Sequence, residues 1–325
     1  MTRPVLLIAL GGTISMQGGG GSGITPKLSG DDLVAAVPGL DQVCDISAVS
    51  PFRIPGASLN ITHIAEVARL INAAEQDYAG FVVVQGTDTI EETAFLLDCL
   101  VSSSRPVVVT GAMRGADAAG ADGPANILSA ATYAASEVGR GLGAVVIFSD
   151  EIHSARLARK ADTGLTSAFT SAPYGPIGRV SEGKVLLALK PAHGPLSLPF
   201  PTSAIPEVAI VSIGFGDSGR SLGGLDQNGI SAVVIQGLGA GHVPEMLSER
   251  ISELAGAMPV VLATRVVNGP VFENTYGFKG SEIDLIGKGV IPSRSLGAVK
   301  ARLMLQVLIA GGADHDHVRA LFSQM

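Results

Sequence analysis

Two glycine–threonine turns and one lysine carry the residues of this chain that could do chemistry. Thr13 follows Gly11-Gly12, and Thr87 and Asp88 follow Gly86. A threonine hydroxyl becomes a nucleophile only when a base withdraws its proton and a donor stabilises the oxyanion that forms. The pair of turns predicts a hydrolase that uses threonine hydroxyls as nucleophiles.

Each turn follows an apolar, β-branched run that is typical of a buried parallel strand, at residues 5–10 and 81–84. Open α/β sheets bind their ligands at the carboxyl ends of such strands. Thr89 and Glu92 have the spacing of a capping box, which predicts a helix that begins just after Asp88. Its free amides would favour negative charge beside Thr87. For a single strand–turn–helix, simple capping by Asp88, with Thr87 fitting the turn, is the better explanation of these residues.

Strands alternate with helices through most of the chain, which predicts parallel sheets with crossover helices. We expect an α/β protein of two domains, each a mostly parallel sheet flanked by helices, with the larger one at the N-terminus. The predicted domains are residues 1–190 and 207–325, joined by a proline-rich linker at 191–206. Predicted strands lie near 4–9, 80–85, 106–110, 143–148, 208–211, 232–235 and 260–263, and predicted helices near 61–76, 90–102, 124–138, 243–257 and 298–310.

Composition narrows the classes of function. The 325 residues are 46% hydrophobic and carry a net charge of -7 without a long basic block, which disfavours nucleic acid and membrane surfaces as partners. Gly11-Gly12 cuts the first apolar run short, so we expect a cytoplasmic protein.

Cys44 and Cys99 are predicted to be ordinary reduced thiols, and no metal site is expected. The glycines at 18–21 and 23 predict a mobile lid after Thr13.

The two turns lie in segments that resemble the signatures of the bacterial L-asparaginases, amidohydrolases that split asparagine into aspartate and ammonia. The chain reads Ala-Leu-Gly-Gly-Thr-Ile at 9–14 and Gln-Gly-Thr-Asp-Thr-Ile-Glu-Glu-Thr-Ala at 85–94. Further similar segments are 105–114, 121–126 and 174–178, so the resemblance spans nearly the whole chain.

The resemblance implies roles for individual residues. Thr13 would attack the side-chain amide carbon and form an acyl-enzyme, and Thr87, Asp88 and Lys160 would form the second half of the site. Taken alone, Lys160 is typical of a solvated loop with Arg156 and Arg159. Beside a threonine and a buried aspartate it could relay a proton. The resemblance implies no metal and no organic cofactor. It does imply a homodimer or homotetramer with sites at a subunit interface.

Substrate contacts are implied at Gly12, Ser58, Gln85, Gly86 and Glu273. Backbone amides of the Gly12 and Thr87 turns would donate to the oxyanion. Glu273 is placed where relatives reach a neighbouring subunit's site, although a surface loop explains it equally well.

The chain departs from the family pattern at three places. No aromatic residue lies between Thr13 and Lys27, where many members have a tyrosine. Ser58 is the sole hydroxyl within 55–60, and Gln85 stands where histidine is common. These departures leave the preference for asparagine or glutamine open.

Three alternatives follow from the sequence. The first is a glutaminase-asparaginase of broader specificity. The second is a non-catalytic nucleotide- or ligand-binding protein, since the glycines at 237, 239 and 241 form half of a dinucleotide fingerprint. The third is the asparaginase-like subunit of a transfer-RNA amidotransferase, which would carry an extra N-terminal domain.

His315-Asp316-His317 is predicted to be a solvated tail rather than a metal site.

Overall fold

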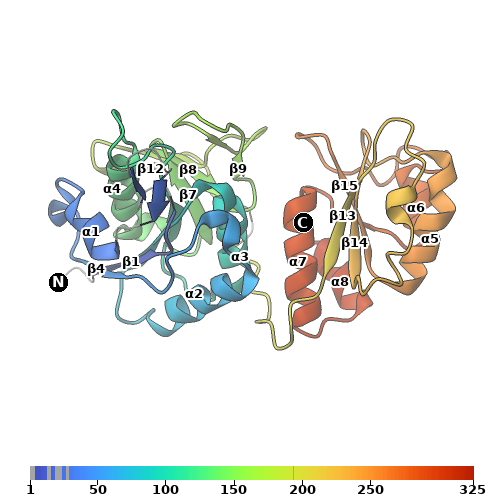
Figure 1. Ribbon diagram of the computed structural model, residues 1–325, viewed down its shortest axis with the longest axis horizontal. Coiled ribbons are helices and arrows are strands. Elements are labelled where there is room, and N and C mark those ends of the chain that lie inside the picture. The colour runs from blue at the N-terminus through green and yellow to red at the C-terminus, as the bar shows by residue number, and fades with distance from the viewer. Residues whose placement is uncertain (1–3, 13–15, 19–23, 27–28, 193) are drawn as a thin grey trace. The chain divides into compact units, whose positions relative to one another are not determined.

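The computed structural model of the chain describes residues 4–12, 16–18, 24–26, 29–192 and 194–325. The chain divides into two compact units, Met1–Ser197 and Leu198–Met325. Helices α1 to α4 belong to the first unit and α5 to α8 to the second (Figure 1). The boundary falls inside the segment predicted as a linker, and the described residues of 191–206 form no helix or strand.

The first unit is built on an eight-stranded sheet in the order β12-β11-β8-β7-β6-β5-β1-β4. The strands β7, β6, β5, β1 and β4 run parallel, and β8, β11 and β12 extend the sheet in antiparallel fashion. Their bounds are β1 Val5–Ala9, β4 Ile46–Val49, β5 Gly80–Val84, β6 Val107–Thr110, β7 Ala144–Phe148, β8 Glu151–Ser154, β11 Gly178–Ser181 and β12 Lys184–Leu187. The predicted mostly parallel sheet is confirmed.

The central strands are buried along their whole length because helices cover both faces of the sheet. One face packs Val5, Leu7 and Val82 against side chains of α1 and α4. α2 and α3 pack against each other, and α3 contacts β6 and β7. These helices are α1 Gly30–Ala35, α2 Ile61–Ala73, α3 Ile90–Leu100 and α4 Gly123–Ala134. Among the described residues, no helix is long and apolar enough to cross a membrane.

Short elements complete the first unit. Two antiparallel ribbons are formed by β2 Met16–Gly18 with β3 Ile24–Pro26, and by β9 Arg159–Lys160 with β10 Phe169–Thr170. Single 3-10 turns are η2 Leu40–Gln42, η3 Gly56–Ser58, η4 Thr87–Thr89 and η5 Glu137–Gly139. Apart from Gly18, the predicted lid at 18–23 lies outside the described residues, as does Thr13.

The second unit holds a four-stranded, all-parallel sheet in the order β13-β14-β15-β16. Helices α7 and α8 lie on one side of this sheet, and α5 and α6 lie on the other (Figure 1). The smaller α/β unit is therefore confirmed. The elements are β13 Val208–Ser212, η6 Arg220–Leu222, β14 Ala232–Gly237, η7 Glu245–Leu247, α5 Ser248–Ala257, β15 Val260–Thr264, α6 Glu282–Gly287, β16 Ile291–Pro292, α7 Ala298–Ala310 and α8 His315–Phe322.

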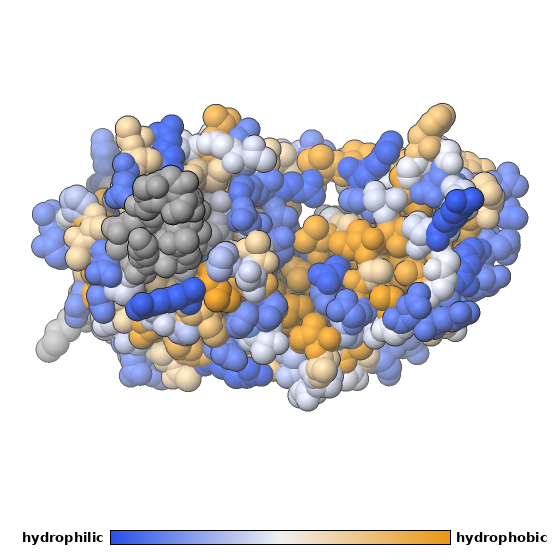
Figure 2. Space-filling model, in the orientation of Figure 1, coloured by the Kyte–Doolittle hydropathy of each residue, from blue (hydrophilic) through white to orange (hydrophobic). Residues whose placement is uncertain are grey.

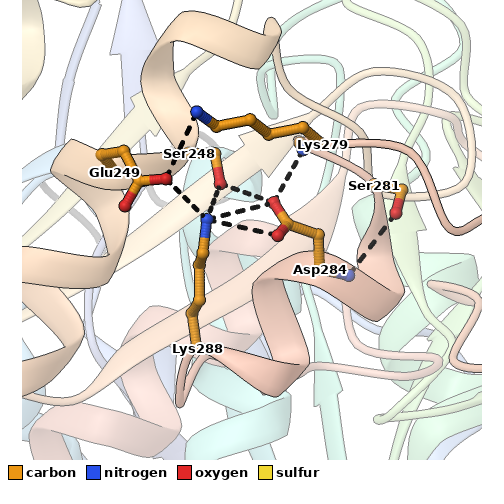
Figure 3. A network of polar contacts seen from close by, with 7 residues as sticks. Ser248, Glu249, Lys279, Ser281, Asp284 and Lys288 are labelled. Carbon is orange, nitrogen blue, oxygen red and sulfur yellow. Dashed lines mark hydrogen bonds and ion pairs between the residues drawn. The ribbon is translucent and has the colours of Figure 1, made fainter.

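A polar network joins α5 to α6 in the second unit (Figure 3). The buried Ser248 hydroxyl donates to Asp284 and accepts from the Lys288 ammonium at 2.6 Å. Lys288 also pairs with Asp284 and with the exposed Glu249, which Lys279 contacts in turn. The network therefore gives the buried hydroxyl a donor and an acceptor and fixes the spacing of the two helices.

Both cysteines, Cys44 and Cys99, are buried and form no disulfide, as expected. Burial raises the pKa of the Cys44 thiol to about 11, with a smaller contribution from Asp45. Cys44 is therefore a packed thiol rather than a reactive thiolate.

Candidate active site

The turns after β1 and β5 meet backbone against backbone. Gly12 has a φ of +98°, and a Cβ added there would lie 2.0 Å from the Gly86 amide nitrogen. Gly56 also packs against this turn, since its Cβ would lie 2.9 Å from the Gly86 carbonyl oxygen. The strand order places β1 beside β5, which brings the two turns to one edge of the sheet. Gly12 and Gly86, both predicted site residues, are therefore in direct contact.

Thr87, Asp88 and Lys160 come together at this edge. The Lys160 Nζ donates to Thr87 Oγ1 at 2.9 Å and to Asp88 Oδ1 at 3.0 Å. Thr87 is buried and the Lys160 side chain is 20% exposed, whereas the Asp88 side chain is 66% exposed. The expectation of a buried aspartate is therefore wrong, because Asp88 lies on the open side of the turn. The cluster can still hold a proton between an amine and a hydroxyl.

Lys160 forms the two-residue strand β9 together with Arg159, so it does not lie in a solvated loop. Its backbone N–H donates to the Glu91 carboxylate at 2.7 Å, and Arg156 pairs with Asp98 at 3.2 Å. The segment thus lies against α3, the helix that follows Thr87 and Asp88. Glu91 carries no sequence signal for this contact, because a glutamate in the first turn of a helix is usually explained by the helix dipole.

The predicted capping box of Thr89 and Glu92 does not form. Thr89 makes no side-chain capping bond, and α3 begins at Ile90 after the turn η4. The Thr89 hydroxyl instead donates to the Gly56 carbonyl at 2.9 Å and accepts from the Gln85 amide at 3.0 Å. These two bonds to other segments replace the local cap and tie η4 to η3.

Gln85 and Ser58 occupy different positions relative to the turn. Gln85 is fully buried, and its amide donates to Gly86 and Thr89, so its side chain braces the turn. Its Oε1 has no hydrogen-bond partner among the residues that the structure describes. Ser58 is exposed at the end of η3, which packs on Gly86 through Gly56. Of the two, Ser58 is thus the one open to a ligand.

The loop after β6 completes the scaffold. A Cβ on Gly111 would lie 2.5 Å from the Gln85 carbonyl oxygen and 3.5 Å from Thr87 Cγ2. The buried Asn126 amide donates to the Gly111 carbonyl and accepts from the Ser149 amide. Asp122 accepts from the amides of Met113 and Arg114. These residues support the Thr87 turn from behind, a role that their spacing in the sequence does not show.

Comparison with known proteins agrees with this geometry. A family model of the asparaginase N-terminal domain matches residues 4–193, and one of the glutaminase/asparaginase C-terminal domain matches residues 207–322. The chain belongs to the L-asparaginase family. It is thus an amidohydrolase by homology, as the resemblance implied.

Curated relatives of this asparaginase family match along nearly their whole length. A probable L-asparaginase of Deinococcus radiodurans is 36% identical over 98% of this chain and 96% of its own. An L-asparaginase of Bacillus licheniformis is 33% identical over 95% of this chain and 96% of its own. L-asparaginase 2 of Escherichia coli K12 is 30% identical over 98% of this chain and 92% of its own.

The remaining residues that the sequence offered as site candidates in this asparaginase-family chain lie in the second unit. Glu273 pairs with Arg294 at 3.1 Å and is about one third exposed. The glycines at 237–241 form a tight turn closed by two bonds between Leu238 and His242, at 2.7 Å each, and α5 begins only at Ser248. A dinucleotide fingerprint would instead open directly into a helix. The turn therefore does not support the nucleotide-binding alternative.

His315 and His317 lie in the first turn of α8, where Asp314 caps the helix by accepting the His317 amide. These residues are therefore helical rather than an irregular tail, but Asp316 and His317 are exposed, as predicted for a solvated segment. Within the described ranges, no group of three potential metal ligands occurs.

Proposed function

We propose that this protein hydrolyses L-asparagine to aspartate and ammonia through a threonine acyl-enzyme. The observation that carries the proposal is the Lys160 ammonium, within 3.0 Å of both Thr87 and Asp88 beside the Gly12 turn. The names of the curated relatives support the choice of asparagine.

In the first step, the Thr13 oxygen forms a bond to the side-chain amide carbon. The hydroxyl proton passes to the departing nitrogen, the carbon–nitrogen bond breaks and ammonia leaves. Backbone amides at the Gly12 and Gly86–Thr87 turns are the proposed oxyanion donors, each worth about 3 kcal/mol in comparable enzymes. Thr13 lies outside the described residues, so its role rests on the resemblance.

In the second step, water attacks the acyl carbon, and its proton returns to the threonine oxygen as the ester bond breaks. Thr87 orients this water, and the hydrogen-bonded cluster of Thr87, Lys160 and Asp88 relays the proton to the threonine oxygen. Acid–base assistance of this kind is typically worth about 10²- to 10⁴-fold in rate. Asp88 pairs with Lys160 at 3.0 Å and so holds its Nζ beside Thr87.

A glutaminase-asparaginase of broader specificity is the second candidate. The match of residues 207–322 to a glutaminase/asparaginase domain favours it. Ammonia release from asparagine, glutamine and their D-forms separates the two candidates. Comparable kcat/KM for L-asparagine and L-glutamine would replace the first proposal with the second.

Two substitutions test the mechanism directly. Thr13→Ala and Thr87→Ala should each lower kcat by about 10³-fold or more, because each removes a hydroxyl that the reaction needs. Circular dichroism and the melting temperature should stay close to those of the wild type. A near-native rate in either variant would remove that threonine from the mechanism.

We further propose that the protein assembles as a homodimer or homotetramer. Figure 2 shows hydrophobic side chains gathered on the visible face of the second unit. Exposed apolar side chains of this unit include Phe215, Met246, Val267 and Phe278. Exposed apolar side chains that gather on one face are typical of subunit interfaces. Sedimentation equilibrium would test the proposed oligomeric state. Cell fractionation would test the predicted cytoplasmic location.

A further inference from the structure

Lys160 lies on β9, a strand that few hydrogen bonds hold in place. The ribbon pairs Lys160 with Phe169 and Arg159 with Thr170, and β9 has no other strand partner among the residues described. Ala161 donates to the Ala168 carbonyl, so the alternation of an antiparallel ladder turns the Lys160 N–H away from β10. An isolated two-stranded ribbon is marginally stable at best. The lysine therefore needs an anchor outside the ribbon.

Glu91 supplies that anchor. Its Oε2 accepts the Lys160 backbone N–H at 2.7 Å across 69 residues of chain. A hydrogen bond to a carboxylate is about twice as strong as one between neutral groups. Glu91 is the second residue of α3 and follows Asp88 by three positions. One helix start thus holds Thr87, Asp88 and the backbone of Lys160.

A second anchor lies two turns further along the same helix. The buried Asp98 accepts from Arg156 Nε at 3.2 Å and from the Ala144 amide at 3.1 Å. Residues seven apart lie on one face of a helix, so Glu91 and Asp98 face the same neighbour. The segment from Arg156 to Lys160 is therefore bound to α3 at both ends.

We propose that Glu91 is a positioning residue that sets the distance from the Lys160 ammonium to Thr87. The inference rests on the proposed function. Glu91 acts on the backbone, and the lysine side chain then spans from this fixed point to Thr87 Oγ1 and Asp88 Oδ1. Without the fixed point the flexible lysine stem moves, and a shift of about 1 Å can cost about 10²-fold in rate.

The test compares Glu91→Ala, Glu91→Gln and Lys160→Ala, with the exposed Glu66→Ala on α2 as a matched control. Glu91→Ala should lower kcat by about 10- to 100-fold and change KM by less than about threefold, because the reacting groups move while the binding loops stay. Glu91→Gln should recover most of kcat, since its amide oxygen can accept the same N–H. Glu66→Ala should match the wild type.

Two outcomes would overturn the inference. One is a kcat for Glu91→Ala within about twofold of the wild type, even with a lowered melting temperature, because Glu91 would then serve stability alone. The other is a Glu91→Gln variant as slow as Glu91→Ala. Lys160→Ala distinguishes a failure of this inference from a failure of the proposed function. Wild-type turnover in Lys160→Ala would contradict the proposed mechanism itself. An inactive Lys160→Ala beside an unaffected Glu91→Ala would sink only the role of Glu91.

Discussion

At the scale of single residues, Gly12 shows how closely the two threonine turns approach. A methyl group there would overlap the Gly86 nitrogen, and its φ of +98° strains any other residue. We expect Gly12→Ala to lower kcat/KM by about 10²-fold and the free energy of unfolding by more than 2 kcal/mol. Urea denaturation and ammonia release measure the two effects.

Gly39→Ala is the matched control for this prediction. Gly39 also has a positive φ, of +76°, but a Cβ there would meet nothing within 4 Å. It should therefore show the backbone cost alone, about 1 kcal/mol, with unchanged activity. If Gly12→Ala behaves like Gly39→Ala, close packing of the turns is not what the site requires.

The meeting of Thr87 with Lys160 could be anticipated from the motifs, but the way it is achieved could not. Thr89 and Glu92 have the spacing of a local cap, yet the Thr89 hydroxyl bonds Gly56, 33 residues away. No local pattern reveals such a partner. The same holds for Glu91, because its contact with the Lys160 backbone depends on where β9 lies in the fold.

At the scale of elements, the continuous apolar runs predicted the buried parallel strands, and α7 matches its predicted bounds at 298–310. The edge strand β4 was missed because its four residues include Ser47 and form no continuous apolar run. The strands β8 to β12 were missed because they have two to four residues each, too few for a clear period. Tertiary contacts stabilise such strands.

The polar network between α5 and α6 gives a prediction at this scale (Figure 3). Asp284→Ala removes the acceptor of the buried Ser248 hydroxyl and a partner of Lys288. We expect the free energy of unfolding to fall by about 2 kcal/mol. Glu249→Ala is the control, because that side chain is 63% exposed and its ion pairs are screened by solvent. Equal stability of the two variants in urea would contradict the assignment.

At the scale of the whole molecule, His153 links stability to pH. The ring is buried on β8, which lowers its pKa to about 4. Glu151, 3.5 Å away, would favour the charged ring, but it is half exposed and burial dominates. Between pH 6.5 and 4 the unfolded chain binds a proton that the folded chain excludes. His153 thus costs no stability above pH 6.5 and costs progressively more, up to about 3 kcal/mol, as the pH falls.

His153→Gln should therefore flatten the fall in unfolding free energy from pH 6.5 to 4, relative to the wild type. Denaturant titrations across this range measure the change, with the exposed His317→Gln as control. An unchanged pH dependence in His153→Gln would show that the buried ring is not responsible.

The position of Lys160 on the β9–β10 ribbon also determines when activity appears during folding. Thr87 and Lys160 are separated by 73 residues, and their bond forms only when α3, the sheet and β9 are all in place. Contacts between such distant parts of a chain are slow to form, since a long loop must close first. During renaturation, helical signal should therefore return before enzyme turnover, and the recovery of ammonia release would time the last step of maturation.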